Sequence, residues 1–200
     1  MTTTLNPAAP WWDEYADMLP GPFLDTIAVE DTAERICTYE TSMVPGLLQT
    51  PEYARMVMTA AGAEPDLVER GVRLRLARQR ILSPDRATRL DVILDEAVVV
   101  RAAQVDTGQL GALLTWPQRP YVTVRVVPFT AGPVIPGQAP FSVLHTAGGV
   151  LAYAESPRGA VLSDAAAFGW DALFDRLDAL AASPEESAEL IRGARRAAQG

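Results

Sequence analysis

Glu96 is the first side chain in this sequence with a position that could do chemistry. It lies in the apolar run 90–100, "LDVILDEAVVV", which we predict to be a strand. Alternation along that strand puts Glu96 on one face with valines and a leucine. A carboxylate on an apolar face must be paired, hydrogen-bonded or protonated. We therefore expect Glu96 either to form a structural ion pair with an arginine such as Arg78, or to line a pocket as a ligand-binding or acid–base group.

A second group of candidates lies further along the chain. His145, the single histidine, falls in the predicted strand "FSVLHT", and Ala147-Gly148-Gly149 after it is typical of a hairpin turn. Tyr153 and Glu155 share one face of the next predicted strand, "VLAYAES". If the hairpin forms, polar groups of both strands can converge. His145, Tyr153 and Glu155 are therefore, with Glu96, the candidate catalytic residues, although a histidine on a strand commonly has no catalytic role.

The segment 39–55, "YETSMVPGLLQTPEYAR", indicates a binding site. A predicted strand ends near Val44, Pro45-Gly46 turns the chain, and a helix begins with Thr50 as its N-cap and Pro51 in its first position. Junctions of a strand with a helix often lie at the rim of a pocket. The predicted ligand-binding residues are Tyr39, Gln49, Tyr53, Arg78, Gln79, Glu96 and Trp116.

The common catalytic motifs are missing from the sequence. It contains no G-x-S-x-G, P-loop, G-x-G-x-x-G or H-E-x-x-H pattern. The single cysteine, Cys37, excludes an internal disulfide and a multi-cysteine zinc site, and we expect it to be buried in the strand "RICTYE". We therefore predict neither a metal nor a cofactor. The missing motifs do not exclude a cofactor-free reaction controlled by the shape of an apolar cavity, because such catalysis needs few polar groups.

Composition predicts one folded domain. The chain has 200 residues, of which 48% are apolar, and we assign residues 11–200 to a single domain after a disordered lead, 1–10. The net charge is −8 and all 17 basic residues are arginine. An acidic chain is poorly suited to polyanionic DNA, so we expect no direct nucleic-acid contact. No signal peptide or apolar stretch of membrane-spanning length is present, which favours a cytoplasmic protein without membrane contact.

The order of predicted elements favours an α+β (or α/β) fold. We expect a mixed or antiparallel sheet of about four to six strands, packed with helices and followed by long C-terminal helices. Strands are predicted near 35–44, 90–100, 121–129, 141–146 and 150–156, and the C-terminal helices over 165–182 and from Ser183. Ser183, Pro184 and Glu186 form a predicted capping box.

Short motifs in a characteristic order cover nearly all of residues 11–195. They are "WWDEY", "YETSMVPGLLQTPEYAR", "RLARQRIL", "VILDEAVVVR", "GQLGALL", "YVTVRVVPFTAG", "APFSVL", "YAES" and "ESAELI". In these motifs the chain resembles a domain of unknown function that follows the helix-turn-helix of many actinobacterial Xre-type, antitoxin-like transcriptional regulators. It departs from that family in two places. Only ten residues precede Trp11, which leaves no room for the helix-turn-helix, and the loop "GPVIPGQAPF" is apolar where the family tends to carry basic residues or histidine.

The resemblance implies a stand-alone domain that senses a small molecule or binds a partner protein and does not itself bind DNA. The alternative is a cofactor-independent enzyme, a cyclase or isomerase, recruited to a secondary-metabolite pathway. A third reading is a structural or antitoxin-like protein that works through its surface. A homodimer is compatible with all three.

Overall fold

A single mixed sheet organises the molecule. The structure, a computed structural model, describes residues 9–132, 139–156, 159–165 and 169–200, so most of the predicted disordered lead lies outside the described residues. Within these ranges six strands pair in the order β3-β2-β1-β4-β5-β6. Their bounds are β1 Arg35–Glu40, β2 Arg89–Asp95, β3 Val122–Val127, β4 Phe141–Thr146, β5 Gly149–Ser156 and β6 Gly159–Asp164. The predicted α+β class with a mixed sheet is confirmed.

The sheet has a parallel half and an antiparallel half. Strands β1, β2 and β3 run parallel to one another, whereas β4 is antiparallel to β1 and begins the antiparallel β4-β5-β6 half. The predicted β4–β5 hairpin is confirmed, with His145 paired to Val150 and Thr146 to Gly149. The direction of pairing therefore changes between β1 and β4, at the middle of the sheet.

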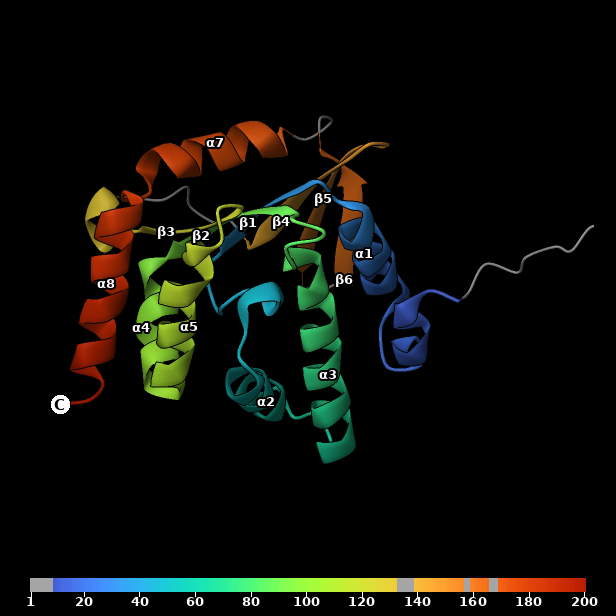
Figure 1. The fold of residues 1–200 in the computed structure, drawn as a ribbon, viewed down its shortest axis with the longest axis horizontal. Helices are drawn as coiled ribbons and strands as arrows, with labels where there is room; N and C mark the ends of the chain where they lie inside the picture. The colour runs from blue at the N-terminus through green and yellow to red at the C-terminus, as the bar shows by residue number, and fades with distance from the viewer. Residues whose placement is uncertain (1–8, 133–138, 157–158, 166–168) are drawn as a thin grey trace, which may run out of the picture.

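Helices cover both faces of the sheet (Figure 1). The α-helices are α1 Gly21–Thr32, α2 Pro51–Ala60, α3 Pro65–Arg78, α4 Glu96–Val105, α5 Thr107–Thr115, α7 Trp170–Leu180 and α8 Pro184–Ala197. The 3-10 helices are η1 Trp11–Tyr15, η2 Gly46–Leu48, η3 Gln79–Leu82, η4 Trp116–Gln118 and η5 Phe129–Ala131.

The helices pack over two core clusters, one on each face of the sheet. Helix α7 packs on one face, where residues such as Tyr39, Val143 and Phe174 form a core cluster. Helices α4, α5 and α8 pack on the opposite face, over a larger cluster that includes Val92, Val124 and Leu110.

Local capping signals set the starts of two helices as expected. The Thr50 hydroxyl accepts a hydrogen bond from Tyr53 N at the start of α2. Ser183 and Glu186 form both hydrogen bonds of a capping box at the start of α8. These side chains supply partners to amide groups that a helix leaves unpaired, so the predicted boundaries hold.

The predicted strand 90–100 is wrong in its second half. Strand β2 ends at Asp95, whose side chain accepts a hydrogen bond from Ala97 N at 2.8 Å and starts α4. Val98, Val99 and Ala102 are buried at helical spacing, whereas Val100 is exposed. The β-branched valines favoured a strand, but the cap and the core contacts of a helix outweigh that preference.

The segment before α7 also differs from expectation. The last of the predicted strands ended at residue 156, but a further strand, β6, forms over Gly159–Asp164 and pairs with β5. The described part of the predicted helix 165–182 includes α7, which starts at Trp170.

Candidate ligand-binding pocket

A small cavity lies where the parallel and antiparallel halves of the sheet meet. Tyr39, near the carboxyl end of β1, pairs with Phe141 at the start of β4. Ligands of sheet proteins commonly bind beyond the carboxyl ends of strands at such a change of topology. The cavity, which we call the junction pocket, has a volume of about 150 Å³. It is lined by Phe23, Thr26, Glu30, Ile36, Thr38, Glu40, Ser42, Met43, Val44, Pro45, Gly46, Leu47, Gln49, Arg75, Arg78, Pro140, Phe141, Ser142 and Tyr153.

An ion pair between α1 and α3 forms one wall of the junction pocket. Arg78 donates from Nε to Glu30 Oε2 at 2.9 Å and from Nη2 to Glu30 Oε1 at 2.7 Å. The two side chains are 10% and 9% exposed. The guanidinium also lies over the Phe23 ring, 5.2 Å from its centroid. The expected pairing of Arg78 with Glu96 is therefore wrong, because Arg78 pairs with Glu30 instead. Two hydrogen bonds from one carboxylate satisfy the buried guanidinium.

Gly46 lets the Arg78 guanidinium approach the backbone. A Cβ atom at Gly46 would lie 3.1 Å from Arg78 Nη1. That separation is tighter than ordinary van der Waals contact, so a Cβ atom at this position would require the guanidinium to shift by a few tenths of an ångström. The Pro45-Gly46 turn therefore shapes the wall of the pocket as well as redirecting the chain.

Side-chain hydrogen bonds hold the irregular segment between β1 and α2. Gln49 donates from Nε2 to Val44 O at 2.8 Å and accepts at Oε1 from Arg75 Nε at 2.8 Å. Gln79 Nε2 donates to Gln49 O at 2.8 Å. Val44 N donates to the Tyr53 hydroxyl at 3.3 Å. Of these predicted ligand-binding residues, Gln49 lines the pocket, whereas Tyr53 and Gln79 secure the segment that forms its rim.

Hydroxyl groups form the sheet side of the junction pocket. Thr38 and Ser142 lie opposite each other on β1 and β4, with their hydroxyl oxygens 2.8 Å apart. Tyr153 is the register partner of Ser142 on β5, and its ring lies beside that of Phe23, with centroids 6.1 Å apart. The cavity therefore brings Tyr153 together with Arg78 and Gln49, three residues that the sequence singled out.

The sheet separates His145 from Tyr153, which corrects the expected convergence. His145 pairs with Val150 and Tyr153 with Ser142, so the two side chains lie on opposite faces. The Nε2 atom of His145 lies 3.2 Å from Oδ1 of Asp171 on α7, away from the pocket. Glu155 lies in β5, but its side chain is outside the described part of the chain.

The remaining predicted residues also lie elsewhere. Glu96 begins α4 instead of lying on a strand, and its Oε2 accepts a hydrogen bond from Phe129 N at 2.6 Å. Tyr39 is buried on the α7 face beside Phe141, with ring centroids 6.1 Å apart. Trp116 packs at the edge of the larger core cluster, under Arg119. These three residues do not line the junction pocket.

Sequence reasoning missed Phe23, Glu30, Thr38 and Ser142. The partners of the last three are distant in the chain: Glu30 is 48 residues from Arg78, and Thr38 is 104 residues from Ser142. The one usable signal was Glu30 itself, an acidic residue that directly follows the apolar residues 27–29. No local pattern identifies its partner.

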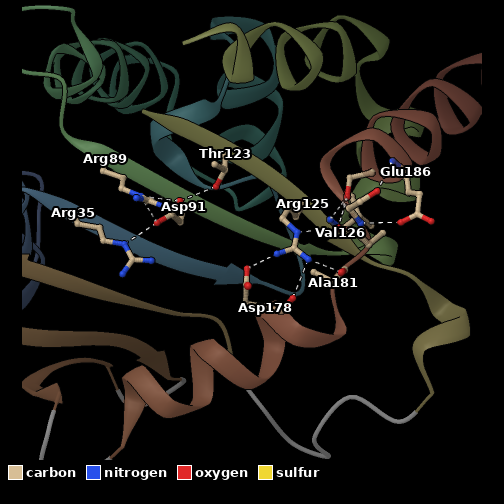
Figure 2. Close-up of polar contacts among 12 residues, drawn as sticks. Arg35, Arg89, Asp91, Thr123, Arg125, Val126, Asp178, Ala181 and Glu186 are labelled. Carbon is tan, nitrogen blue, oxygen red and sulfur yellow. Dashed lines mark hydrogen bonds and ion pairs between the residues drawn. The ribbon is translucent and has the colours of Figure 1, made fainter. Parts of the chain in front are cut away.

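Two groups of polar contacts lie on the opposite face of the sheet (Figure 2): one around Asp91 joins β1, β2 and β3, and one at Arg125 fastens α7 to β3. Asp91 accepts hydrogen bonds from Arg35 Nε at 2.7 Å, Arg89 Nε at 3.0 Å and Thr123 Oγ1 at 2.9 Å. Burial by itself raises the pKa of Asp91, but these hydrogen bonds outweigh it and leave the pKa below its ordinary value. Arg125 donates to Asp178 at 2.6 Å. The Asp91 carboxylate is thus held by three hydrogen bonds, and it acts as a structural counter-ion for Arg35 and Arg89.

The residues that the structure describes contain no group of three or more potential metal-binding side chains and no helix that is long and apolar enough to cross a membrane.

Searches of curated proteins and of solved structures found no match. A family model described as a domain of unknown function (DUF5753) matches residues 23–193. That span includes every residue that lines the junction pocket. The chain therefore belongs to the DUF5753 family.

Proposed function

We propose that this protein is a ligand-binding module that takes a small polar molecule into the junction pocket. One observation carries the proposal: a buried Arg78–Glu30 pair and a cluster of hydroxyl groups meet in one cavity at the change of sheet topology. Binding sites commonly combine a concave surface with a few convergent polar groups. The resemblance to regulator domains supports a sensing role, in which a partner protein reads the occupied state.

The size and charge of the cavity limit the ligand. A volume of 150 Å³ corresponds to about five water molecules at roughly 30 Å³ each, so only a small molecule, or one small group of a larger molecule, fits inside. Arg78 and Glu30 neutralise each other. The hydroxyl groups of Thr38, Ser142 and Tyr153 can donate or accept hydrogen bonds. A neutral or zwitterionic ligand with several hydrogen-bonding groups fits these features best.

Ligand binding would connect parts of the chain that are far apart in the sequence. Phe23 belongs to α1, Arg78 to α3 and Ser142 to β4, and all three line the cavity. A molecule that contacts all three stabilises their mutual arrangement, because it binds the folded state and not the unfolded chain. Such stabilisation is the signal that a partner protein could detect.

Native mass spectrometry of the purified protein, followed by a thermal-shift screen of small polar metabolites, tests the proposal. We expect to find a ligand that raises the Tm of the protein. Ser142→Ala and Tyr153→Phe should each lower the affinity for this ligand about tenfold, which is the effect of losing one hydrogen bond. The matched controls are Thr59→Ala on α2 and Tyr121→Phe, whose hydroxyl donates to Leu82 O outside the pocket. Equal affinities for all four variants would place binding elsewhere.

A cofactor-independent cyclase or isomerase is the second candidate. It is favoured by the presence of Tyr153 and the Glu40 carboxylate in the same cavity, since such groups can transfer protons. The two functions differ in a measurable way. An enzyme converts the bound molecule into an isomer of equal mass, detectable by NMR, and Tyr153→Phe then lowers turnover more than affinity. A sensor releases its ligand unchanged.

A further inference from the structure

The outer side of α8 carries four charges in a regular order. Glu185 and Glu189 lie in its first half, and Arg192 and Arg196 in its second half, and all four are exposed. Their spacings of four, three and four residues place them within about 60° of arc on one side of a helix with 3.6 residues per turn. This charged stripe faces away from Ile191, which is buried in the core.

An open groove lies between α8 and α4, and the four side chains of the charged stripe line it on the α8 side. It has a volume of about 1250 Å³, and its walls include Val100 of α4 and Leu180 of α7, which are 43% and 38% exposed. Gly193 and Ala197 line the groove on the α8 side. A groove of this size with exposed apolar walls is suited to a helix of another molecule.

Hydrogen bonds to β3 fix the position of α8. Val126 N donates to Ser187 Oγ at 3.0 Å, and Ala182 N donates to Val126 O at 2.8 Å. Arg125 donates to the carbonyl groups of Ala181 and Ala182 just before the helix (Figure 2). The stripe and the groove are therefore presented by a rigid element, which lowers the entropic cost of docking.

We propose that this surface binds a second copy of the chain, with the two α8 helices antiparallel across a two-fold axis. Antiparallel alignment places Glu185 opposite Arg196 of the partner subunit and Glu189 opposite Arg192 of the partner subunit. Both pairs have the same midpoint, between Leu190 and Ile191, so one axis serves both. A two-fold interface requires a self-complementary surface, and this order of charges supplies it.

The helix dipole does not account for the whole stripe. Dipole effects act within the first and last turns of a helix. Glu189 and Arg192 lie near the middle of the 14-residue α8, where they form an ion pair within one chain at 2.6 Å. In the antiparallel dimer this pair meets its symmetry mate and forms a ring of four alternating charges. A parallel arrangement would instead oppose like charges, which is unfavourable.

Light scattering after size exclusion, together with native mass spectrometry, measures the assembly. We expect the wild-type chain at twice its 21.5 kDa mass. We expect the charge-reversal variants Glu185→Arg/Glu189→Arg and Arg192→Glu/Arg196→Glu to be monomeric when alone. When mixed in equal amounts they should form a heterodimer, because the opposed charges again differ in sign. This rescue cannot arise from misfolding of either variant.

Arg195→Glu is the matched control, because Arg195 lies on the side of α8 that faces Gly111 of α5. It should remain dimeric, and circular dichroism should show folded protein for every variant. The proposal is overturned if the wild type is monomeric, if either reversal variant remains a dimer alone, or if the mixed variants fail to associate. These results do not depend on any ligand of the junction pocket.

Discussion

Arg78 contributes both to the stability of the fold and to the shape of the junction pocket. Its guanidinium is paired with Glu30, lies over Phe23 and packs against Gly46. Removal of one member of a buried ion pair leaves the other charge without a partner. This makes the contribution of the pair measurable by mutation.

We predict that Glu30→Gln lowers the free energy of unfolding by about 3–5 kcal/mol. The double variant Glu30→Gln/Arg78→Met should recover part of this loss, because it leaves no unpaired charge. Urea unfolding monitored by circular dichroism measures both. Glu69→Gln, in the exposed Arg55–Glu69 pair, is the control and should change stability far less, because solvent screens that pair. Equal losses at Glu30 and Glu69 would contradict the role of the buried pair.

Cys37 gives the protein a predictable response to alkaline pH. Burial raises the pKa of the Cys37 thiol from 9.0 to about 12. The unfolded chain therefore releases this proton at lower pH than the folded protein. The resulting contribution to stability is complete below pH 9 and declines above it, by up to about 1.4 kcal/mol per pH unit as far as about pH 12.

We therefore predict a fall in the urea midpoint between about pH 8 and pH 10.5 that is shallower in Cys37→Ala than in the wild type. Tyr39, whose pKa burial also raises to about 12, contributes to the slope in both proteins. The comparison uses slopes, so a general loss of stability in the variant does not affect it. Parallel pH profiles would show that the thiol does not contribute.

Gln109 connects α5 to the irregular segment before α2. It is fully buried, accepts from Thr50 N at 2.7 Å and donates to Leu48 O at 2.9 Å. Replacing it with leucine removes the partners of the buried Leu48 O and the partly buried Thr50 N. We predict that Gln109→Leu lowers the free energy of unfolding by about 2–4 kcal/mol, measured by urea unfolding. Gln118→Leu, at an exposed position in η4, should have little effect, and a similar loss at both sites would refute this role.

At the scale of elements, sequence patterns succeeded where local contacts decide the outcome. Thr50 and Ser183 start their helices through hydrogen bonds that span three residues, and the β4–β5 hairpin forms at a short turn. The run 90–100 failed because two signals compete within it. Its valines favour a strand, whereas the Asp95 cap favours a helix, and burial of Val98 against the sheet decides between them.

The charge of the whole molecule leads to a prediction about DNA. The chain carries a net charge of −8, and DNA binding depends on cationic surfaces that displace counter-ions. We predict no tight binding of this chain alone to promoter DNA at physiological salt in a fluorescence anisotropy titration. Tight binding that weakens steeply as salt is added would contradict the prediction and reveal a local basic surface.

Local patterns in the chain were sufficient for the α+β class, the helix caps, the hairpin and the selection of Gln49, Arg78 and Tyr153 as polar groups of interest. They could not identify Glu30 as the partner of Arg78 or Ser142 as that of Thr38, because 48 and 104 residues separate these pairs. Nor could they reveal that His145 and Tyr153 point to opposite faces. The register of the β4–β5 pair fixes that, because a shift of one residue would move every side chain of a strand to the other face.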